Sequence, residues 1–255
     1  MKIYPTNITD NQWTTILNIL EDNRKRKHCL REIFDALFYL LKTGCQWRML
    51  PKEFPKWELV YYYFKKWKTD GTFEILLEVI RGKVRRKFNK NEEPSVGIID
   101  SQSVKTTNVG GGNIGYDGGK KVKGRKRHIV VDTLGLLLFV VVHSANIHDS
   151  QSARNVLERF REQFHTIKKV FADGGYRGEL IDIVKAKCSI ILEVVLRTDT
   201  EEKFKVLPKR WIVERTFAWF GNYRRLSKDF EFQSDTSEAM LQLAMINIML
   251  KKLYK

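Results

Sequence analysis

The stretch Ser95-Val-Gly-Ile-Ile-Asp-Ser101 places a carboxylate, Asp100, at the end of a short apolar run. Valine and isoleucine favour β-structure, and Pro94 precedes the run, so we expect a buried strand that ends at Asp100. An ionised carboxylate in such a place is unfavourable unless a cation meets it. Asp100 is either an ordinary turn residue that closes the strand or a metal ligand. The second interpretation requires partner acids at the ends of other elements.

The composition predicts a folded, basic protein. Of the 255 residues, 43% are hydrophobic and 12% aromatic, which suffices for a packed core and argues against global disorder. The chain has 46 lysine and arginine residues against 30 acidic residues, a net charge of +16. We therefore expect an anionic partner, with a nucleic acid as the first candidate.

Cysteine usage and hydropathy predict a soluble intracellular protein. Cys29, Cys45 and Cys188 form no CxxC pair, which is typical of buried thiols in a reducing compartment and not of a disulfide framework or a zinc site. The N-terminus lacks the apolar core of a signal peptide. The longest apolar run, residues 136–142, is too short to span a bilayer, so we expect no membrane partner.

Residues 1–88 predict a small all-α domain. A capping box at Thr9–Gln12 begins the first helix, and three further helices follow from apolar spacing. The third helix could enter a DNA groove in a helix-turn-helix manner, and the simpler alternative is a structural bundle with solvated lysines. We favour DNA contact because the whole chain is basic. This third helix is expected to direct Trp57, Val60, Tyr61, Phe64 and Trp67 inward and to carry Lys65, Lys66 and Lys68 near its end.

A polar linker, residues 89–95, is expected to separate this domain from a second one, residues 96–255. The glycine-rich stretch 109–119 contains a formal GxGxxG, but basic residues and not a helix pattern follow it, which excludes a dinucleotide site. The next run is interpreted as a basic loop beside the Asp100 strand. A merely solvated loop is the alternative, and we favour contact with a nucleic-acid backbone through Lys120, Lys121, Lys123, Arg125, Lys126 and Arg127.

The second domain is expected to contain five strands in the order β-β-β-α-β-α-β-α. Residues 128–131 and 136–142 predict a hairpin after the Asp100 strand, and the last two strands are expected at 169–173 and 189–196. Helices are expected at 150–164, at 179–187, from about 208, and at 237–254. This order is typical of a mixed sheet covered by helices, an α/β fold.

Two further acids match the requirement set by Asp100. Asp173 ends the fourth predicted strand, and Glu214 lies on the following long helix one turn after Arg210. If the first and fourth strands are neighbours, both aspartates meet at one sheet edge. Three carboxylates together favour Mg²⁺ or Mn²⁺, and two ions would suit phosphoryl transfer. Singly, Asp173 could be only a turn former before two glycines, and Glu214 only a partner of Arg210.

A second polar cluster, His143, His148 and Asp149, has a spacing that suits no common zinc site. Asp149 stands immediately before the helix expected at residue 150. We therefore interpret Asp149 as the helix cap.

With these motifs in place, the chain resembles DDE-type insertion-sequence transposases, specifically the insertion-sequence-five family. The resemblance extends over nearly the whole chain. Two strings resemble the N-terminal domain of that family, Gly44-Cys-Gln-Trp-Arg-Met-Leu-Pro51 and Trp67-Lys-Thr-Asp-Gly71. Five resemble its catalytic core: Asp100-Ser-Gln-Ser-Val-Lys105, Gly115-Tyr-Asp-Gly-Gly-Lys-Lys121, Lys123-Gly-Arg-Lys-Arg-His128, Ala172-Asp-Gly-Gly-Tyr-Arg177 and Trp211-Ile-Val-Glu-Arg-Thr-Phe217.

The resemblance implies a ribonuclease-H-like core with Asp100, Asp173 and Glu214 as catalytic, metal-binding acids. It also implies Mg²⁺- or Mn²⁺-dependent cutting of double-stranded DNA at the terminal inverted repeats, strand transfer to target DNA, and a homo-oligomer on DNA in the cytoplasm of a bacterium or archaeon. The wider superfamily has a Tyr-x2-Arg-x3-Glu-x6-Lys signature. Arg210 and Glu214 match it, but Leu207 replaces the tyrosine and Gly221 the lysine.

The missing lysine leaves a phosphate contact to be supplied by another residue. Arg225 lies three helical turns beyond Glu214 if the helix continues, so it is our candidate, together with Arg210 and the basic run. The rival interpretations are a host nuclease or resolvase on the same fold, and a non-catalytic DNA-binding protein derived from a transposase. A structure-specific cut without strand transfer would indicate the first rival, and the presence of all three acids argues against the second.

Overall fold

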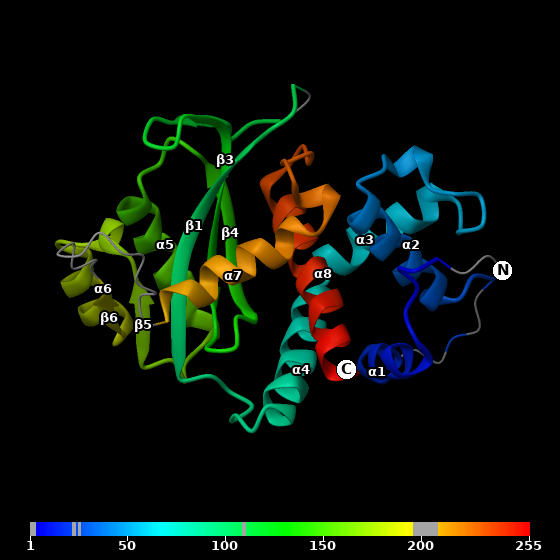
Figure 1. The fold of residues 1–255 in the computed structure, drawn as a ribbon, viewed down its shortest axis with the longest axis horizontal. Coiled ribbons are helices and arrows are strands. Elements are labelled where there is room, and N and C mark those ends of the chain that lie inside the picture. Colours follow the sequence, from blue (N-terminus) through cyan, green and yellow to red (C-terminus); the bar gives the residue numbers. More distant parts are fainter. Residues whose placement is uncertain (1–3, 22–23, 25–26, 109–110, 196–208) are drawn as a thin grey trace, which may run out of the picture. The chain divides into compact units, whose positions relative to one another are not determined.

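The computed structural model describes residues 4–21, 24, 27–108, 111–195 and 209–255. The chain divides into two compact units (Figure 1). The first consists of residues 1–90, 220–228 and 239–255, and the second of residues 91–219 and 229–238. Among the described residues, we find no helix with the length and apolar character needed to cross a membrane.

The first unit is entirely helical. Thr9 and Gln12 form the predicted capping box at the start of the first helix, and Gly44, with a φ of 71°, ends the second. The rings of Phe34 and Trp67 stack with centroids 4.6 Å apart in the core. The elements are α1 (Asp10–Leu20), α2 (Leu30–Thr43), η1 (Trp47–Met49), α3 (Trp57–Thr69), α4 (Thr72–Lys87), η3 (Arg224–Leu226) and most of α8 (Ser234–Leu253).

On α3 the inward face is narrower than the sequence predicts. Val60, Phe64 and Trp67 are buried, but Tyr61 is 42% exposed. Residues 60, 64 and 67 follow the helical period along one stripe, whereas position 61 lies at its margin. The prediction that Tyr61 points inward is therefore wrong, and its ring packs edge-on against Trp47 instead.

The second unit is built on a mixed six-stranded sheet, which confirms the predicted α/β class. The strand order is β2-β3-β1-β5-β6, and β4 also pairs with β3. Pairs β1–β3, β2–β3 and β3–β4 are antiparallel, while β1–β5 and β5–β6 are parallel. The strands are β1 (Val96–Lys105), β2 (Gly115–Asp117), β3 (Val122–Val131), β4 (Leu137–Ser144), β5 (Lys169–Ala172) and β6 (Ile191–Val194).

The sheet differs from the five predicted strands in two places. The short β2 comes from the glycine-rich stretch, where a Cβ at Gly115 would collide with the side chains of Ser144 and Asn146. The predicted basic loop is instead the first half of β3, because residues 101–105 of β1 continue past Asp100 and pair with it. Asp100 therefore lies in the middle of its strand and not at its end.

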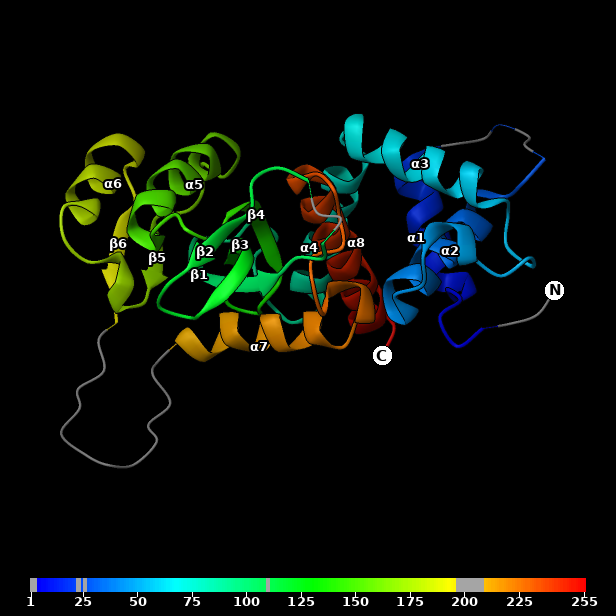
Figure 2. The ribbon, with the colours of Figure 1, turned by 90° about the horizontal axis from the view of Figure 1, so that it is seen from above.

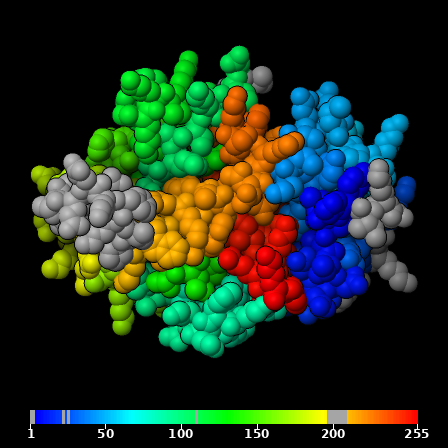
Figure 3. All heavy atoms as spheres, in the orientation of Figure 1, coloured from blue at the N-terminus to red at the C-terminus, as the bar shows by residue number. Residues whose placement is uncertain are grey.

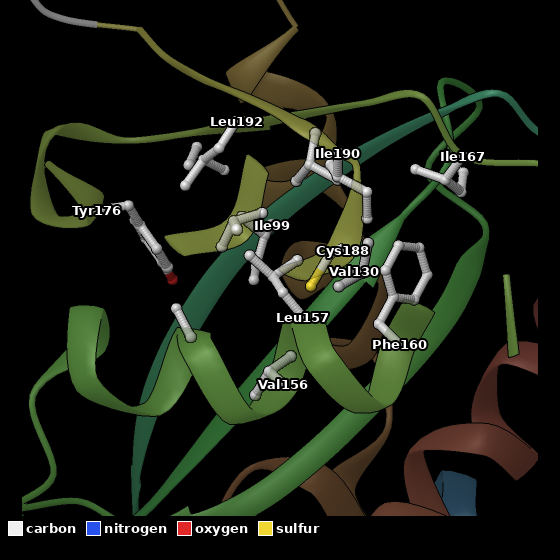
Figure 4. Packing of buried hydrophobic residues seen from close by; sticks show 14 of the residues in the cluster. Ile99, Val130, Val156, Leu157, Phe160, Ile167, Tyr176, Cys188, Ile190 and Leu192 are labelled. Carbon is white, nitrogen blue, oxygen red and sulfur yellow. The ribbon is translucent and has the colours of Figure 1, made fainter. Parts of the chain in front are cut away.

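Helices cover both faces of the sheet (Figure 2). On one side lie α5 (Asp149–Gln163) and α6 (Leu180–Cys188), and on the other lies α7 (Arg210–Gly221). The main core cluster fills the space between the sheet and α5, with Ile99, Val130, Leu157 and Phe160 among its members (Figure 4). The helix α7 is held by Thr216, whose hydroxyl donates to the carbonyl of Gly135 at 2.8 Å.

The C-terminal region is divided between the units differently from the predicted domains. The sequence assigns residues 96–255 to a single domain, whereas residues 220–228 and 239–255 pack within the helical unit. Their contacts there are specific. The hydroxyl of Tyr223 donates to Asn247 at 2.9 Å, and Gln242 donates to Glu74 at 2.8 Å. The apolar face of the last helix thus completes the core of the helical unit, which four N-terminal helices leave open.

Candidate active site

The parallel pairing of β1 with β5 brings Asp100 and Asp173 to the same level of the sheet. Ile98 pairs with Phe171, and each aspartate lies two residues further along its own strand direction. The sequence allowed these two strands to be neighbours, and the sheet shows that they are. Because residues two apart on a strand project from the same face, Asp100 projects from the same face as Ile98, the one that α7 covers.

The position of Asp173 follows from the local sequence. Strand β5 ends at Ala172, and Asp173 caps the short helix η2 (Gly174–Tyr176), accepting a hydrogen bond from the Gly175 amide at 2.9 Å. This is the turn-forming role that an aspartate before two glycines suggests. One carboxylate oxygen is used in the turn, and the other remains available to a further partner.

The electrostatic environment of Asp100 disfavours its charge. Burial, with a further contribution from the negative charge of Asp173, raises the pKa of Asp100 to about 7. The Ser101 amide, which donates to Asp100 at 2.7 Å, and the nearby cations Lys120 and Arg210 oppose this rise without cancelling it. Asp100 and Asp173 therefore form an acid pair whose charge the surrounding protein only partly compensates.

Glu214 reaches this pair through Arg210. Both lie on α7, one turn apart, and the Arg210 Nη2 is 3.3 Å from Glu214 Oε1 and 4.0 Å from Asp173 Oδ2. The Glu214 side chain is 55% exposed and that of Arg210 18%, and the helix α7 that carries them faces the viewer in Figure 3. The sequence offered two interpretations of Glu214, an intrahelical partner or a member of the acid set, and this geometry is compatible with both.

The donor set fits a hard divalent cation at the two aspartates. Among the described residues, no three His, Cys, Asp or Glu side chains are close enough to one another to hold a metal ion. Asp100 and Asp173 nevertheless supply carboxylate oxygens from β1 and from the end of β5. Burial and the charge of Asp173 raise the pKa of Asp100, and a bound Mg²⁺ or Mn²⁺ would stabilise its ionised form. The guanidinium of Arg210 provides the positive charge between Asp173 and Glu214 in this structure.

The predicted basic run separates into an exposed and a buried half. Lys120, Lys121 and Lys123 are exposed at the β2–β3 turn, and Lys120 Nζ donates to the carbonyl of Ser101 at 3.2 Å, immediately beside Asp100. These three lysines remain candidates for DNA contact. Lys120 and Lys121 are exposed because they lie in the turn between β2 and β3, and Lys123 is exposed at the start of β3.

The other half of the run is buried, so the prediction of a solvent-facing loop is wrong there. Arg125, fully buried, is 3.3 Å from Asp229 and donates to the carbonyls of Glu231 and Phe232. Burial lowers the pKa of Arg127 to about 10. Lys126 Nζ is 2.8 Å from Asp149. These residues are in the interior because β3 is paired on both edges and covered on both faces.

Arg225 does not occupy the position that the sequence suggests. The helix α7 ends at Gly221, so Arg225 is not three turns beyond Glu214 on the same helix. It lies in η3, is buried in the helical unit, and donates to the carbonyl of Cys45 at 3.3 Å. The helical argument for Arg225 as a phosphate contact is therefore wrong. The related position Leu207 falls outside the described residues.

On α3, Lys65 and Lys66 are exposed and Lys68 is half-buried. Lys65 and Lys66 lie one helical turn after Tyr62, whose side chain is 57% exposed. The exposed side of α3 is thus basic and aromatic, as a DNA-binding face would require, and this placement is compatible with the predicted role.

The cluster of His143, His148 and Asp149 has a structural role. His148, not Asp149, caps α5, since its side chain accepts from the Ser150 amide. Asp149 is the first residue of the helix, and its carboxylate accepts from Ser101 Oγ at 2.8 Å and binds Lys126. The prediction that Asp149 is the cap is wrong because a polar partner on β1 and another on β3 engage its side chain.

Sequence reasoning missed two buried polar residues behind the acid pair, His128 and Tyr176. The Tyr176 hydroxyl is 2.7 Å from His128 Nε2, and both side chains are fully buried. The available signal was the position of Tyr176 three residues after Asp173, separated from it only by glycines.

With this geometry established, comparison with known proteins identifies the family. Residues 91–249, more than half of the chain, match the transposase DDE domain family. The chain belongs to the family of DDE transposases. Residues 8–77 match a second family, described as putative transposases of the IS4/5 family. The DDE family implies a ribonuclease-H-like core, in agreement with the sheet described above.

A curated relative supports the same family. The putative transposase for insertion sequence element IS402 from Burkholderia cepacia is 31% identical over 127 residues. The matched region covers 47% of this chain and 60% of that relative, so the match spans less than two thirds of the relative's length.

Proposed function

We propose that this protein is a DNA transposase that binds the terminal inverted repeats of an insertion sequence, cleaves the ends and joins the 3′-hydroxyls to target DNA. The observation that carries the proposal is the parallel pairing of β1 with β5, which brings Asp100 on β1 and Asp173, just after β5, to the same level of the sheet, with Arg210 between Asp173 and Glu214 in a chain of the DDE family. The reaction class is phosphoryl transfer between DNA phosphodiesters and hydroxyl groups.

In this proposal, Asp100 and Asp173 hold the divalent cations, and Glu214 joins them. Bound Mg²⁺ or Mn²⁺, two ions in the usual arrangement for this chemistry, would supply Lewis acidity for the attacking and leaving oxygens. Glu214 becomes available when Arg210 turns from the carboxylates to a DNA phosphate. Arg210 suits this role because its planar guanidinium binds carboxylate and phosphate in the same geometry.

The DNA backbone would be held by exposed lysines in both units, namely Lys65 and Lys66 on α3 and Lys120, Lys121 and Lys123 at the β2–β3 turn. Lys120 is the best placed for the scissile phosphate, because its Nζ contacts the carbonyl of Ser101. Each lysine that contacts a phosphate releases counterions, so binding should weaken steeply with salt.

The experiment combines the protein, Mg²⁺, an inverted-repeat duplex and a target plasmid, and resolves nicked and joined products. Asp100→Asn, Asp173→Asn and Glu214→Gln should retain DNA binding and lose cleavage by at least about 10³-fold, the usual consequence of removing an essential catalytic group. Asp182→Asn, which alters an exposed acid on α6, is the matched control and should cleave normally. Normal cleavage by any of the three test variants would overturn the assignment of that acid.

The same assay separates the rival functions. A structure-specific nuclease or resolvase would cut by DNA structure and give no joined product. A non-catalytic DNA-binding protein would shift the duplex in a gel and leave it intact at every Mg²⁺ or Mn²⁺ concentration.

DNA binding has its own test on α3. Lys65→Ala and Lys66→Ala should each weaken binding of the inverted-repeat duplex and lower the slope of log affinity against log salt by about 1. Lys185→Ala, which changes an exposed lysine on α6, should leave both quantities unchanged. An unchanged slope in both α3 variants would contradict a DNA-binding role for this helix.

A further inference from the structure

We propose that Tyr176 and His128 form a buried anchor that fixes Asp173 relative to Asp100, and that both are positioning residues for strand cleavage. The inference rests on the proposed function, because that function gives Asp173 its role. Neither residue is assigned any role by the family match.

The anchor ties the segment after Asp173 to the strand that backs Asp100. Tyr176 is the last residue of η2, and its hydroxyl lies 2.7 Å from Nε2 of His128. His128 lies on β3 directly opposite Ser101, the residue that follows Asp100. This hydrogen bond therefore ties the segment after Asp173 to β3, the strand paired with β1, at a point beyond the end of the β1–β5 pairing.

The direction of each hydrogen bond follows from proton counting. His128 Nδ1 is 3.2 Å from Ser152 Oγ, which lies 3.1 Å from the carbonyl of Asp149 and 3.2 Å from that of His148. When the serine proton goes to a carbonyl of α5, the serine oxygen accepts from Nδ1–H and Nε2 accepts from the Tyr176 hydroxyl, which also has a side-chain hydrogen bond with Ser101. Burial, with His143 nearby, lowers the pKa of His128, which keeps the ring neutral.

The sequence around Asp173 explains why such an anchor is needed. Gly174 and Gly175 follow it and have no side chains to fix their backbone. Tyr176 is the first residue after Asp173 whose side chain can be held by the core. Figure 4 shows its ring at the end of the core cluster, beside the N-terminal part of α5. Loss of the hydroxyl bond would remove the polar restraint on Tyr176 and leave the Asp173 segment held by ring packing and by the glycine turn.

The anchor lies on the face of the sheet opposite Asp100. Successive strand residues project to opposite faces, so Ser101 and its partner His128 face α5, whereas Asp100 faces α7. Tyr176 and His128 thus have no access to DNA at the acid pair. They affect the reaction only through the position of Asp173. A displacement of about 1 Å in a reacting group is enough to reduce the rate about 100-fold.

The test compares two buried tyrosines that lose the same hydroxyl. Tyr176→Phe removes the bond to His128, and Tyr223→Phe removes the bond to Asn247 in the helical unit. Both variants should lose a similar amount of thermal stability. Only Tyr176→Phe should lower the single-turnover cleavage rate, by about 10- to 100-fold, and it should raise the Mn²⁺ concentration for half-maximal cleavage several-fold. Duplex affinity without metal should not change in either variant.

A second readout does not depend on activity. Calorimetric titration of Mn²⁺ into DNA-free protein should show weaker binding for Tyr176→Phe than for Tyr223→Phe. His128→Gln, whose amide can accept from the tyrosine and donate to the serine, should recover part of the loss that His128→Ala causes. Equal Mn²⁺ affinity and equal cleavage in the two tyrosine variants would overturn the anchor.

The outcomes distinguish this inference from the proposed function. If Asp173→Asn cleaves DNA normally, the proposed function fails and the anchor has no role to support. If Asp173→Asn is inactive while Tyr176→Phe behaves like Tyr223→Phe, the proposed function stands and the anchor alone is wrong.

Discussion

Asp100 lies on β1 and Asp149 contacts β1 through Ser101, but the two carboxylates lie on opposite faces of the sheet, and their environments shift their pKa values in opposite directions. Burial and Asp173 raise the pKa of Asp100 to about 7. Burial alone would raise the pKa of Asp149 as well, but hydrogen bonds from Lys126 and Ser101 hold it below its ordinary value. Ser101, the partner of Asp149, directly follows Asp100 on β1, so one strand contributes neighbouring residues to both environments.

The difference indicates that the α5 face stabilises the fold and that the α7 face carries the proposed functional site. On the α5 face, the fold supplies partners for buried charge, as in the contact of Lys126 with Asp149, and the result is a defined structure. On the α7 face, the carboxylates are only partly compensated, and the structure retains an unfavourable charge that a cation would relieve. Uncompensated buried charge in a folded protein often marks a functional site.

The largest effect should come from breaking the compensated side. Lys126→Met removes the buried ammonium and leaves Asp149, with a side chain 24% exposed, without its cation. Loss of one partner of a fully buried ion pair costs about 3–5 kcal/mol. Water partly hydrates the Asp149 carboxylate, so we expect a somewhat smaller loss of unfolding free energy, about 2–4 kcal/mol. Urea denaturation measures it, and the exposed Lys123→Met serves as control. Equal stability of these two variants would remove the contrast between the faces.

Asp100→Asn should act with the opposite sign. The folded-state pKa of Asp100 lies above the ordinary value, so its contribution favours folding at low pH and is lost as the pH rises from about 4 towards 7. The neutral asparagine avoids the cost of ionisation. In EDTA at pH 8, the variant should be more stable than the parent by about 1–2 kcal/mol, since partial solvation reduces the full effect.

The comparison at pH 5 provides the control for this prediction. There Asp100 is protonated in the folded protein while the unfolded carboxyl is largely ionised, so the advantage of asparagine should be clearly smaller than at pH 8 and should vanish only below about pH 4. Destabilisation of Asp100→Asn at both pH values would contradict the claim that the ionised Asp100 carboxylate is unfavourable in the folded protein.

Added metal should have a smaller effect, confined to the α7 face. Mg²⁺ at ten times its dissociation constant should stabilise the parent protein by about 1.4 kcal/mol. The effect should be present at pH 8 and reduced at pH 5, where protons compete for Asp100. Thermal melts with and without Mg²⁺ measure it, and a gain that survives in Asp100→Asn would place the metal elsewhere.

Ser101→Ala should have the smallest effect and tests how independent the faces are. It removes the bond of 2.8 Å to Asp149 and the side-chain hydrogen bond with Tyr176, at a cost of about 1 kcal/mol, while Tyr176 keeps its bond to His128. Asp149 keeps Lys126, and the Ser101 amide still donates to Asp100. Cleavage should therefore stay within about threefold of the parent, a change of less than 1 kcal/mol in activation free energy. A large loss of cleavage with unchanged stability would show that the two faces are coupled.

The topology could be predicted from the sequence because it depends on local patterns. Apolar runs and turn residues locate the strands around Asp100 and Asp173, and the alternation of strands and helices restricts how they pair. The α/β class followed from this order, which also allowed those two strands to be neighbours. The roles of the two aspartates remain a proposal.

The rest depends on distant partners, which local patterns do not contain. Residues 101–105 are polar and resemble a loop, yet Ser101 and Ser103 are held by Asp149 and Asp117. Arg125 resembles a solvated residue but is buried by Asp229, about a hundred positions later in the chain. Arg225 was misplaced because nothing in its immediate sequence shows that α7 stops at Gly221.

The central claim is that Asp100 and Asp173 together bind the divalent metal, and Mn²⁺ binding to DNA-free protein tests it most directly. Electron paramagnetic resonance of free Mn²⁺ would give the dissociation constant for the parent, Asp100→Asn, Asp173→Asn and the exposed control Asp182→Asn. We predict that each of the two site variants weakens binding by about tenfold or more, a loss of at least 1.4 kcal/mol, and that the control does not. Parent-like Mn²⁺ affinity in both site variants would contradict the claim.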